Sequence, residues 1–161
     1  GYSGGGKKMI AEYEQETRSE FLNAPRQYGL TQAHKHLKEM QALCGLEVPP
    51  VFSPVVGDFY AGMQVSVPLF ASAEKLREIY AEHYKNSKLI RLAAGEEYGA
   101  FLPANALAGR DDMYISVYGN AERAVCVALF DNLGKGASGA AVQNMNVMFG
   151  LPEETGLHLG K

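Results

Sequence analysis

The sequence is poor in several residue types and patterns, and each shortage excludes a class of protein. It has no tryptophan and only two cysteines among its 161 residues. Its longest unbroken apolar run is the seven residues from Ala124 to Phe130, whereas a transmembrane helix needs about 20. Acidic residues outnumber basic ones, and the net charge of −3 gives no general attraction to nucleic acid or to acidic membranes. The polar, glycine-rich start predicts no secretory signal.

The two cysteines, Cys44 and Cys126, match no metal-binding spacing. Cys126 lies within the apolar run, which predicts a buried and unreactive thiol. Cys44 precedes Gly45 at the expected end of a helix. A reducing cytoplasm fits both cysteines, so a cytoplasmic location is expected. The chain length and the apolar content of 47% predict one ordinary folded domain with its own core.

Two glycine-rich stretches resemble nucleotide-binding motifs, but neither motif is complete. Gly134 to Gly139 has the spacing G-x-G-x-x-G, yet only 22 residues follow it, and they contain no second strand. Gly1 to Lys8 has the spacing G-x-x-x-x-G-K-K, but it lacks the preceding strand and the Ser or Thr that holds magnesium. A flexible turn into a helix is the simpler interpretation. The N-terminus of that helix, with Lys7 nearby, could still hold an anionic group.

Hydrophobic periodicity and breaker residues predict an alternation of helices and strands. Expected helices cover about residues 7–20, 33–43, 73–85 and 137–149, and expected strands cover 51–56, 63–70, 88–92, 113–118 and 124–130. Gly45 should end the second helix, and Ser72 should cap the third, with His83 on its inner face. Residues 93–112 should be irregular because Gly95, Gly99, Pro103 and Gly109 interrupt them.

Short turns between consecutive strands, such as Gly119 to Glu122, favour an α+β fold. The sheet should be mixed and mostly antiparallel, with helices on one face. Polar and apolar residues alternate from Gln64 to Val67, which predicts a strand face that is wet or faces a partner. The candidates for this uncovered face are Met63, Val65, Val67, Tyr114, Ser116 and Tyr118. Their mixed polarity suits a protein interface.

Three stretches, in the same order along the chain, resemble one family. Asn132 to Leu157 has the sequence NLGKGASGAAVQNMNVMFGLPEETGL, Gly1 to Lys8 has GYSGGGKK, and Tyr28-Gly29-Leu30 is followed by His34-Lys35-His36. They resemble the C-terminal signature, the segment after the catalytic cysteine and the His-basic-His segment of N-acetyl-gamma-glutamyl-phosphate reductase. The resemblance covers only the second half of that enzyme. The nucleotide domain and the cysteine nucleophile are absent, and neither Cys44 nor Cys126 has the nucleophile's sequence setting.

This resemblance implies an α+β domain like the C-terminal domain of glyceraldehyde-3-phosphate dehydrogenase, paired with a second copy through its sheet. Residues 1–133 would form this catalytic and dimerisation domain. Residues 134–161 would form a glycine-rich turn, a helix and a tail that pack against the absent nucleotide-binding domain.

The resemblance also implies NADPH-dependent reduction of N-acetyl-gamma-glutamyl phosphate to N-acetylglutamate semialdehyde and phosphate, in arginine biosynthesis. A cysteine thiolate would attack the acyl phosphate, phosphate would leave, and NADPH would deliver hydride to the thioester. Two other functions remain open. They are a non-catalytic dimerisation module of the same fold, and the matching domain of an aspartate-semialdehyde dehydrogenase-like enzyme. Without the nucleophile, this chain alone is expected to be inactive.

His34 and His36 are the only close pair of histidines in the sequence. On the residues alone, a surface or capping role is the simpler interpretation, and no further ligand completes a metal site. The family resemblance instead implies a catalytic acid or base in this segment, with His36 the first candidate and His34 the second.

The resemblance implies binding residues at both ends of the chain. The expected substrate-binding residues are Ser3, Gly4 and Lys7, and those beside the nicotinamide of NADP are Gly134, Gly136, Ala137 and Ser138. Related families grip the substrate carboxylate with an Arg before a Gly, where this sequence has Ala61-Gly62. Arg26, Lys7 and Arg91 are therefore the candidates for the carboxylate partner.

Overall fold

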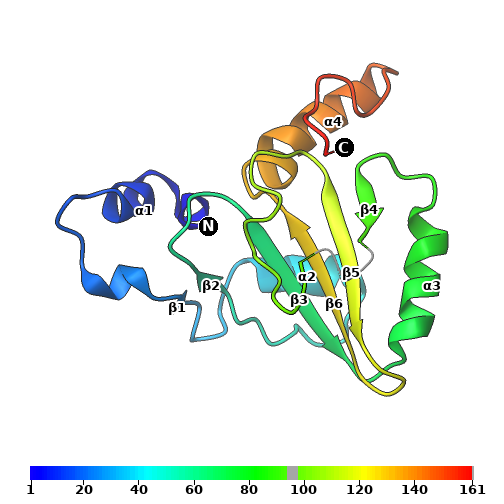
Figure 1. The fold of residues 1–161 in the computed structure, drawn as a ribbon, viewed down its shortest axis with the longest axis horizontal. Helices are drawn as coiled ribbons and strands as arrows, with labels where there is room; N and C mark the ends of the chain where they lie inside the picture. Colours follow the sequence, from blue (N-terminus) through cyan, green and yellow to red (C-terminus); the bar gives the residue numbers. More distant parts are fainter. Residues whose placement is uncertain (94–97, 161) are drawn as a thin grey trace.

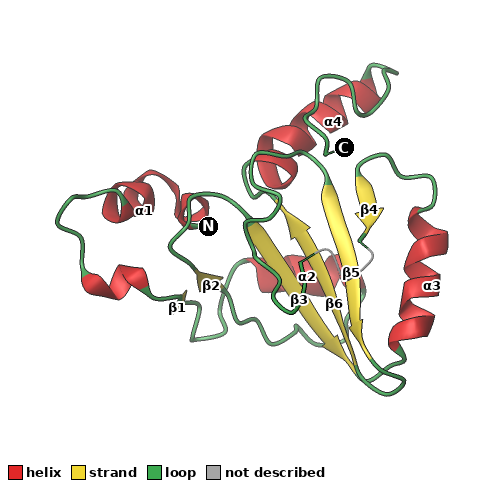
Figure 2. Cartoon of the chain, viewed as in Figure 1, coloured by secondary structure: helices red, strands yellow, loops and turns green. Residues whose placement is uncertain are grey.

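The computed structural model describes residues 1–93 and 98–160, arranged as a main sheet with flanking helices and a smaller N-terminal lobe (Figures 1 and 2). The helices are α1 (Gly6–Tyr13), α2 (His36–Cys44), α3 (Ala73–Tyr84) and α4 (Gly139–Met148). The strands are β1 (Arg26–Gln27), β2 (Val55–Val56), β3 (Met63–Leu69), β4 (Ile90–Leu92), β5 (Met113–Gly119) and β6 (Ala124–Phe130). Three short helical turns are η1 (Tyr2–Gly5), η2 (Glu20–Asn23) and η3 (Gly134–Ser138).

The main sheet has the strand order β3-β6-β5-β4. Strand β6 pairs antiparallel with β3 and β5, and only β4 runs parallel to its neighbour. The hairpin between β5 and β6 turns at Gly119, whose φ of 135° suits glycine and whose Cβ would lie 2.1 Å from the Arg123 carbonyl oxygen. The predicted mixed, mostly antiparallel sheet and its hairpin are confirmed.

Helix α3 packs on one face of this sheet against β5 and β6, and leaves β3 exposed. Ser72 caps it as predicted, because its hydroxyl accepts a hydrogen bond from the Lys75 amide at 3.4 Å. Ala73 is buried there with Val117, Ala124 and Cys126 of β5 and β6, and Leu76 and Tyr80 pack against this cluster. The prediction that His83 faces the core is wrong. The cluster ends at Tyr80, so the last turn leaves His83 exposed.

The opposite face of the sheet is covered by the irregular segment before β5, not by a partner. Leu107 is buried there with Tyr114, Val127 and Leu129, and Leu102 and Ala106 pack beside them. As predicted, the described part of residues 93–112 contains no helix or strand; Gly95 lies outside the described residues.

The predicted uncovered face was wrong in composition, because its members lie on opposite faces of the sheet. Val65 pairs through Ala128 with Ile115, whereas Gln64 pairs through Leu129 with Tyr114. Paired residues point to the same side, so the alternate residues point to the other. Tyr114 and Ser116 are buried, and Tyr118 packs beside Tyr114. The exposed members are Met63, Val65 and Val67, on the edge strand β3 and on the same face as α3.

The N-terminal lobe contains η1, α1, η2 and the two-stranded sheet of β1 and β2 (Figure 1). Tyr13, Leu22 and Val56 form its buried cluster. Helix α1 ends at Tyr13 and not near residue 20, and the Arg18 guanidinium donates to the free Tyr13 carbonyl oxygen at 3.1 Å. Of the strand predicted over residues 51–56, only Val55–Val56 is paired.

Two further expectations concern helix ends. Gly45 ends α2 in the left-handed conformation with φ 62°, as predicted. The predicted glycine-rich turn after β6 is instead the helical turn η3, which continues directly into α4. The longest helix, α3, has 12 residues, and none within the described part of the chain combines the length and apolar character of a membrane span.

Candidate functional site

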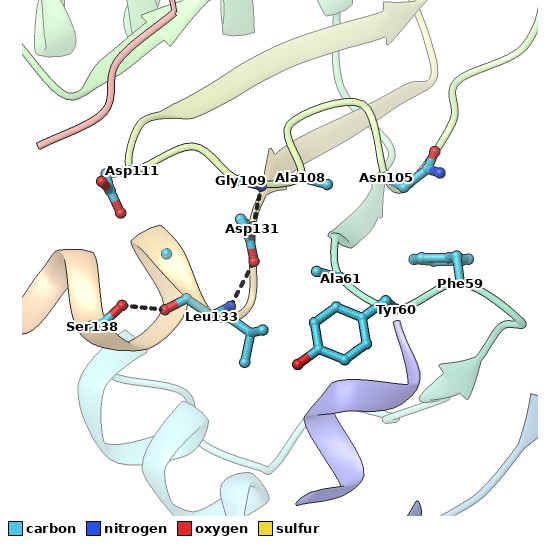
Figure 3. A pocket seen from close by; sticks show the side chains of 11 residues that line it. Phe59, Tyr60, Ala61, Asn105, Ala108, Gly109, Asp111, Asp131, Leu133 and Ser138 are labelled. Atoms are coloured by element: carbon cyan, nitrogen blue, oxygen red, sulfur yellow. Dashed lines mark hydrogen bonds between the residues drawn. The ribbon is translucent and has the colours of Figure 1, made fainter. Parts of the chain in front are cut away.

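A cleft of about 690 Å³ lies at the end of the main sheet where the chain leaves β6 (Figure 3). Three segments line it, and each belongs to a connection between regular elements. The lining residues are Phe59, Tyr60 and Ala61 before β3; Asn105, Ala108, Gly109 and Asp111 before β5; and Asp131, Leu133, Gly134 and Ser138 after β6. Its volume falls in the range typical of small-molecule sites. We take this cleft as the candidate active site.

Asp131 joins two walls of the cleft through its side chain (Figure 3). Only 3% of the residue is exposed, and one carboxylate oxygen accepts a hydrogen bond from the Leu133 amide at 2.7 Å. The other oxygen accepts a hydrogen bond from the Gly109 amide. A buried carboxylate needs such donors, and here they hold the segment before β5 against the start of η3.

Asn132, the next residue, joins the remaining wall. Its Nδ2 donates to the Ser3 hydroxyl oxygen at 2.9 Å, and its Oδ1 accepts from the Gly62 amide at 2.8 Å. The Gly1 nitrogen donates to the Gly62 carbonyl oxygen at 2.7 Å. The glycine-rich N-terminal stretch, residues 1–8, and the C-terminal stretch, residues 132–157, therefore meet at Asn132.

Gly134 of η3 and Gly139 of α4 have packing roles. A Cβ on Gly134 would lie 2.2 Å from the Arg110 carbonyl oxygen, and one on Gly139 would lie 2.2 Å from Asp111 Oδ1. Both distances are too short for any other residue without movement of the backbone or of Asp111. The G-x-x-x-x-G spacing therefore allows η3 and α4 to approach the segment before β5.

The amide groups of η3 are partly used within the turn itself. The Gly136 amide donates to the Asp131 carbonyl oxygen at 2.8 Å, and the Ser138 amide donates to that of Leu133 at 2.9 Å. The Ser138 hydroxyl also donates to the Leu133 carbonyl oxygen, at 2.8 Å. Of the residues predicted to meet the nicotinamide, Gly134 and Ser138 line the cleft, whereas Gly136 and Ala137 do not.

The predicted substrate-binding residues lie behind the wall formed by residues 59–61. The amides of Tyr2 and Ser3 donate to the carbonyl oxygens of Phe59 and Tyr60 at 2.8 and 3.0 Å. Ser3 is 5% exposed, so its hydroxyl faces Asn132 and not solvent. Gly4 and Lys7 are exposed and are not lining residues. The N-terminal segment therefore lies beside the cleft, but Ser3, Gly4 and Lys7 do not line it.

His34 and His36 lie together at the start of α2, and neither lines the cleft. Their rings are 4.7 Å apart between centroids, and the His36 amide donates to Nδ1 of His34 at 3.3 Å. Acceptance at Nδ1 places the proton of a neutral His34 on Nε2. His34 also packs against Phe52 at 5.1 Å, whereas His36 is exposed. His36 is therefore the freer of the two to exchange a proton with another molecule.

The candidate carboxylate partners are engaged elsewhere or lie outside the cleft. Arg26 donates to the Tyr13 hydroxyl at 3.1 Å, and Arg91 donates to the Gly160 carbonyl oxygen at 2.7 Å. Among the described residues, the cleft lining includes two carboxylates and no lysine or arginine. The described residues, 1–93 and 98–160, also contain no cluster of three or more His, Cys, Asp or Glu side chains that could hold a metal ion.

Sequence reasoning missed most of the polar residues at the cleft. Asp111 and Asn105 lie in an irregular segment, where no periodicity indicates their direction. Asp131 and Asn132 gave a usable signal, because two polar residues directly follow an apolar strand and precede glycine. Such residues at a strand end are well placed to organise the following turn.

Comparison with known proteins assigns the family. The family model described as the semialdehyde dehydrogenase dimerisation domain matches residues 1–132. The chain belongs to this family. The match includes both sheets and ends at Asn132, so η3 and α4 lie beyond it.

The chain is also similar to curated N-acetyl-gamma-glutamyl-phosphate reductases. It is 43% identical to reductase 2 of Nostoc sp., over 98% of this chain and 54% of that protein. It is 44% identical to the reductase of Sinorhizobium fredii, over 92% of this chain and 51% of that protein. It is 45% identical to the reductase of Brucella anthropi, over 93% of this chain and 52% of that protein. The chain spans about half the length of the curated relatives it matches, and the resemblance drawn from its three stretches is confirmed.

Proposed function

We propose that this chain is the C-terminal half of an NADPH-dependent reductase that converts N-acetyl-gamma-glutamyl phosphate to N-acetylglutamate semialdehyde and phosphate. The similarity to reductases of that name, at 43–45% identity over at least 92% of the chain, carries the proposal. The reaction would serve arginine biosynthesis. The two free cysteines of the chain, Cys44 and Cys126, suit a reducing cytoplasm.

This half would supply binding and proton-transfer groups, and the other half would supply the nucleophile. Cys126 is buried under α3, and Cys44 is exposed at the end of α2, and neither lines the cleft. A thiolate from the other half would attack the acyl phosphate and expel phosphate, and bound NADP in its reduced form would supply the hydride that converts the thioester to the aldehyde.

The cleft suits the nicotinamide end of NADP and not its phosphates. Tyr60, Ala61 and Leu133 offer aromatic and apolar surface, and Gly134 and Ser138 also line the cleft. Phosphates favour cationic partners, whereas the described lining offers two carboxylates and neither a lysine nor an arginine. The phosphate-binding groups therefore belong to the other half.

The acid or base in this proposal is His36, with His34 as its neighbour. An exposed imidazole can protonate the oxyanion of the acyl group and deprotonate the thiol. The pair lies outside the cleft in this chain. Its approach would depend on the other half or a second copy, and catalytic contacts often tighten only in the complete site.

Two exposed apolar surfaces are assigned to partners. Met63, Val65, Val67 and Leu69 form an exposed row on β3, 38–47% exposed, and we assign it to a homodimer interface. Met148 and Phe149 at the end of α4 are 83% and 74% exposed, and we assign them to the nucleotide-binding half. The tail returns to the main domain, because the Asp111 amide donates to the His158 carbonyl oxygen at 2.8 Å. Only part of residues 134–161 would thus contact the other half.

The deciding experiment measures NADPH oxidation by the complete protein with N-acetyl-gamma-glutamyl phosphate, and compares it with aspartyl phosphate. The proposal expects turnover with the first substrate and none with the isolated chain. Preference for aspartyl phosphate would favour an aspartate-semialdehyde dehydrogenase-like enzyme. If the protein still dimerised but turned over neither substrate, the result would favour a non-catalytic dimerisation module.

A further inference from the structure

We propose that Asn132 is a positioning residue that ties the N-terminal segment and one wall of the cleft to the turn η3. This inference rests on the proposed function, since it concerns how the reductase aligns its site. Asn132 stands between Asp131 and Leu133, which both line the cleft, yet it is not itself a lining residue. Its amide side chain forms hydrogen bonds with Ser3 and Gly62, neither of which lines the cleft.

The bond from the Gly62 amide to Asn132 acts on a tightly packed junction. Gly62 has φ 125°, and a Cβ there would lie 2.5 Å from the Cα of Asn105 and 2.6 Å from the Ala104 carbonyl oxygen. A displacement of Gly62 would therefore also move Asn105, which lines the cleft. Through this one contact, Asn132 holds residues 60–62 and the segment before β5 in register with η3.

The bond from Asn132 to Ser3 brings in the N-terminal segment. Ser3 is buried, and its hydroxyl oxygen accepts from Asn132 Nδ2. Its amide already donates to the Tyr60 carbonyl oxygen. The amide and the hydroxyl of Ser3 thus serve the protein interior, and Ser3 acts through Asn132 and not as a direct substrate ligand. Loss of either side chain should loosen the same joint.

The test uses a double-mutant cycle in the complete reductase, with Ser3→Ala, Asn132→Ala and both together. Misplacement of reacting groups lowers the rate of the chemical step, so each single variant should lower kcat about tenfold and change KM by less than about twofold. The double variant should be no worse than Asn132→Ala alone, because both changes open one joint. Ser53→Ala, which removes an exposed hydroxyl outside the cleft lining, is the matched control and should keep wild-type kcat.

Two results would overturn the proposal. A raised KM with unchanged kcat in Ser3→Ala would make Ser3 a substrate ligand, and multiplied losses in the double variant would show that the two residues act independently. Hydrogen exchange provides a readout that needs no substrate. Asn132→Ala should speed amide exchange at Gly62 and across residues 134–138, and unchanged exchange there would also reject the proposal. If the wild-type reductase lacked turnover, the proposed function would fail, while exchange would still decide whether Asn132 forms the joint.

Discussion

Val65 and Tyr114 lie on opposite faces of the main sheet. Val65 shares a row with Ala128 and Ile115, whereas Tyr114 shares the neighbouring row with Gln64 and Leu129. Tyr114 is 7% exposed beneath the segment before β5, and Val65 is 44% exposed. Of the six residues predicted to form an open face, the exposed ones are therefore Met63, Val65 and Val67, all on β3 and on the same face as α3.

Val65→Glu should convert the dimer that we propose into a monomer. A charge placed in the centre of an apolar interface is desolvated without a partner, which weakens association strongly. Light scattering of the chain at tens of micromolar would measure the change. Met148→Glu, on the exposed end of α4, is the matched control and should leave the dimer intact. The reverse pattern would show that α4 and not β3 forms the interface.

The elements predicted best are those fixed by local chemistry. Ser72 and Gly45 mark helix ends by capping, and the hairpin at Gly119 follows from its turn residues. Predicting these features requires no knowledge of distant contacts. The face of the sheet that stays open depends on which strand lies at the edge. It also depends on the course of residues 98–112. Neither property appears in the periodicity of a single strand.

The candidate site was predictable only in part for the same reason. The resemblance pointed to Gly134 and Ser138, which do line the cleft. It did not indicate that Asp131 and Asn132 orient the walls, because their hydrogen bonds with Gly109, Gly62 and Ser3 join residues 22 to 129 positions apart in the sequence. The roles of His34 and His36 remain predictions.

Asp112→Ala should destabilise the chain by about 2 kcal/mol, since it leaves the half-buried guanidinium of Arg110 without its charged hydrogen-bond acceptor. Asp112 is fully buried, and it accepts hydrogen bonds from Arg110 at 2.8 and 2.6 Å. These bonds hold the pKa of Arg110 above its ordinary value. Urea unfolding would measure the loss. Glu82→Ala breaks the exposed pair with Lys85 and should cost less than about 1 kcal/mol; equal losses would contradict this account.

Asp58 should contribute to the stability of the N-terminal lobe in a pH-dependent way. Hydrogen bonds from the Arg18 guanidinium, at 2.8 and 2.6 Å, lower the pKa of the Asp58 carboxyl below 3.8 in the folded state. A lowered folded pKa gives stability that is present above the unfolded pKa and lost as pH falls through the folded value. Asp58→Asn should therefore flatten the fall in the unfolding midpoint below about pH 4. An unchanged acid limb would mean that the pair adds no stability.

His36→Ala should lower kcat of the complete reductase about 10²–10⁴-fold with a smaller change in KM, as expected for an acid or base. His34→Ala should cost less, because His34 is held by Phe52 and by the His36 amide and serves to orient its neighbour. Steady-state kinetics across pH would separate the two. A large loss confined to His34→Ala would transfer the role to His34, and full activity of both variants would remove the histidines from the mechanism.

Gly134→Ala should destabilise the chain by about 1–3 kcal/mol even when no cofactor is bound, as overpacking does. Alanine forms helices better than glycine by up to about 1 kcal/mol, so propensity alone would predict a gain in η3. Packing opposes this gain, because the new Cβ would lie 2.2 Å from the Arg110 carbonyl oxygen, and that backbone oxygen cannot rotate away. Gly4→Ala is the control, since its Cβ would meet only Asn132 Nδ2 at 3.8 Å. Thermal unfolding of both variants without NADP would decide between packing and cofactor contact. A selective loss of stability in Gly134→Ala would show that the approach of η3 to Arg110 requires the glycine. Equal stability of the two variants would assign Gly134 to cofactor contact.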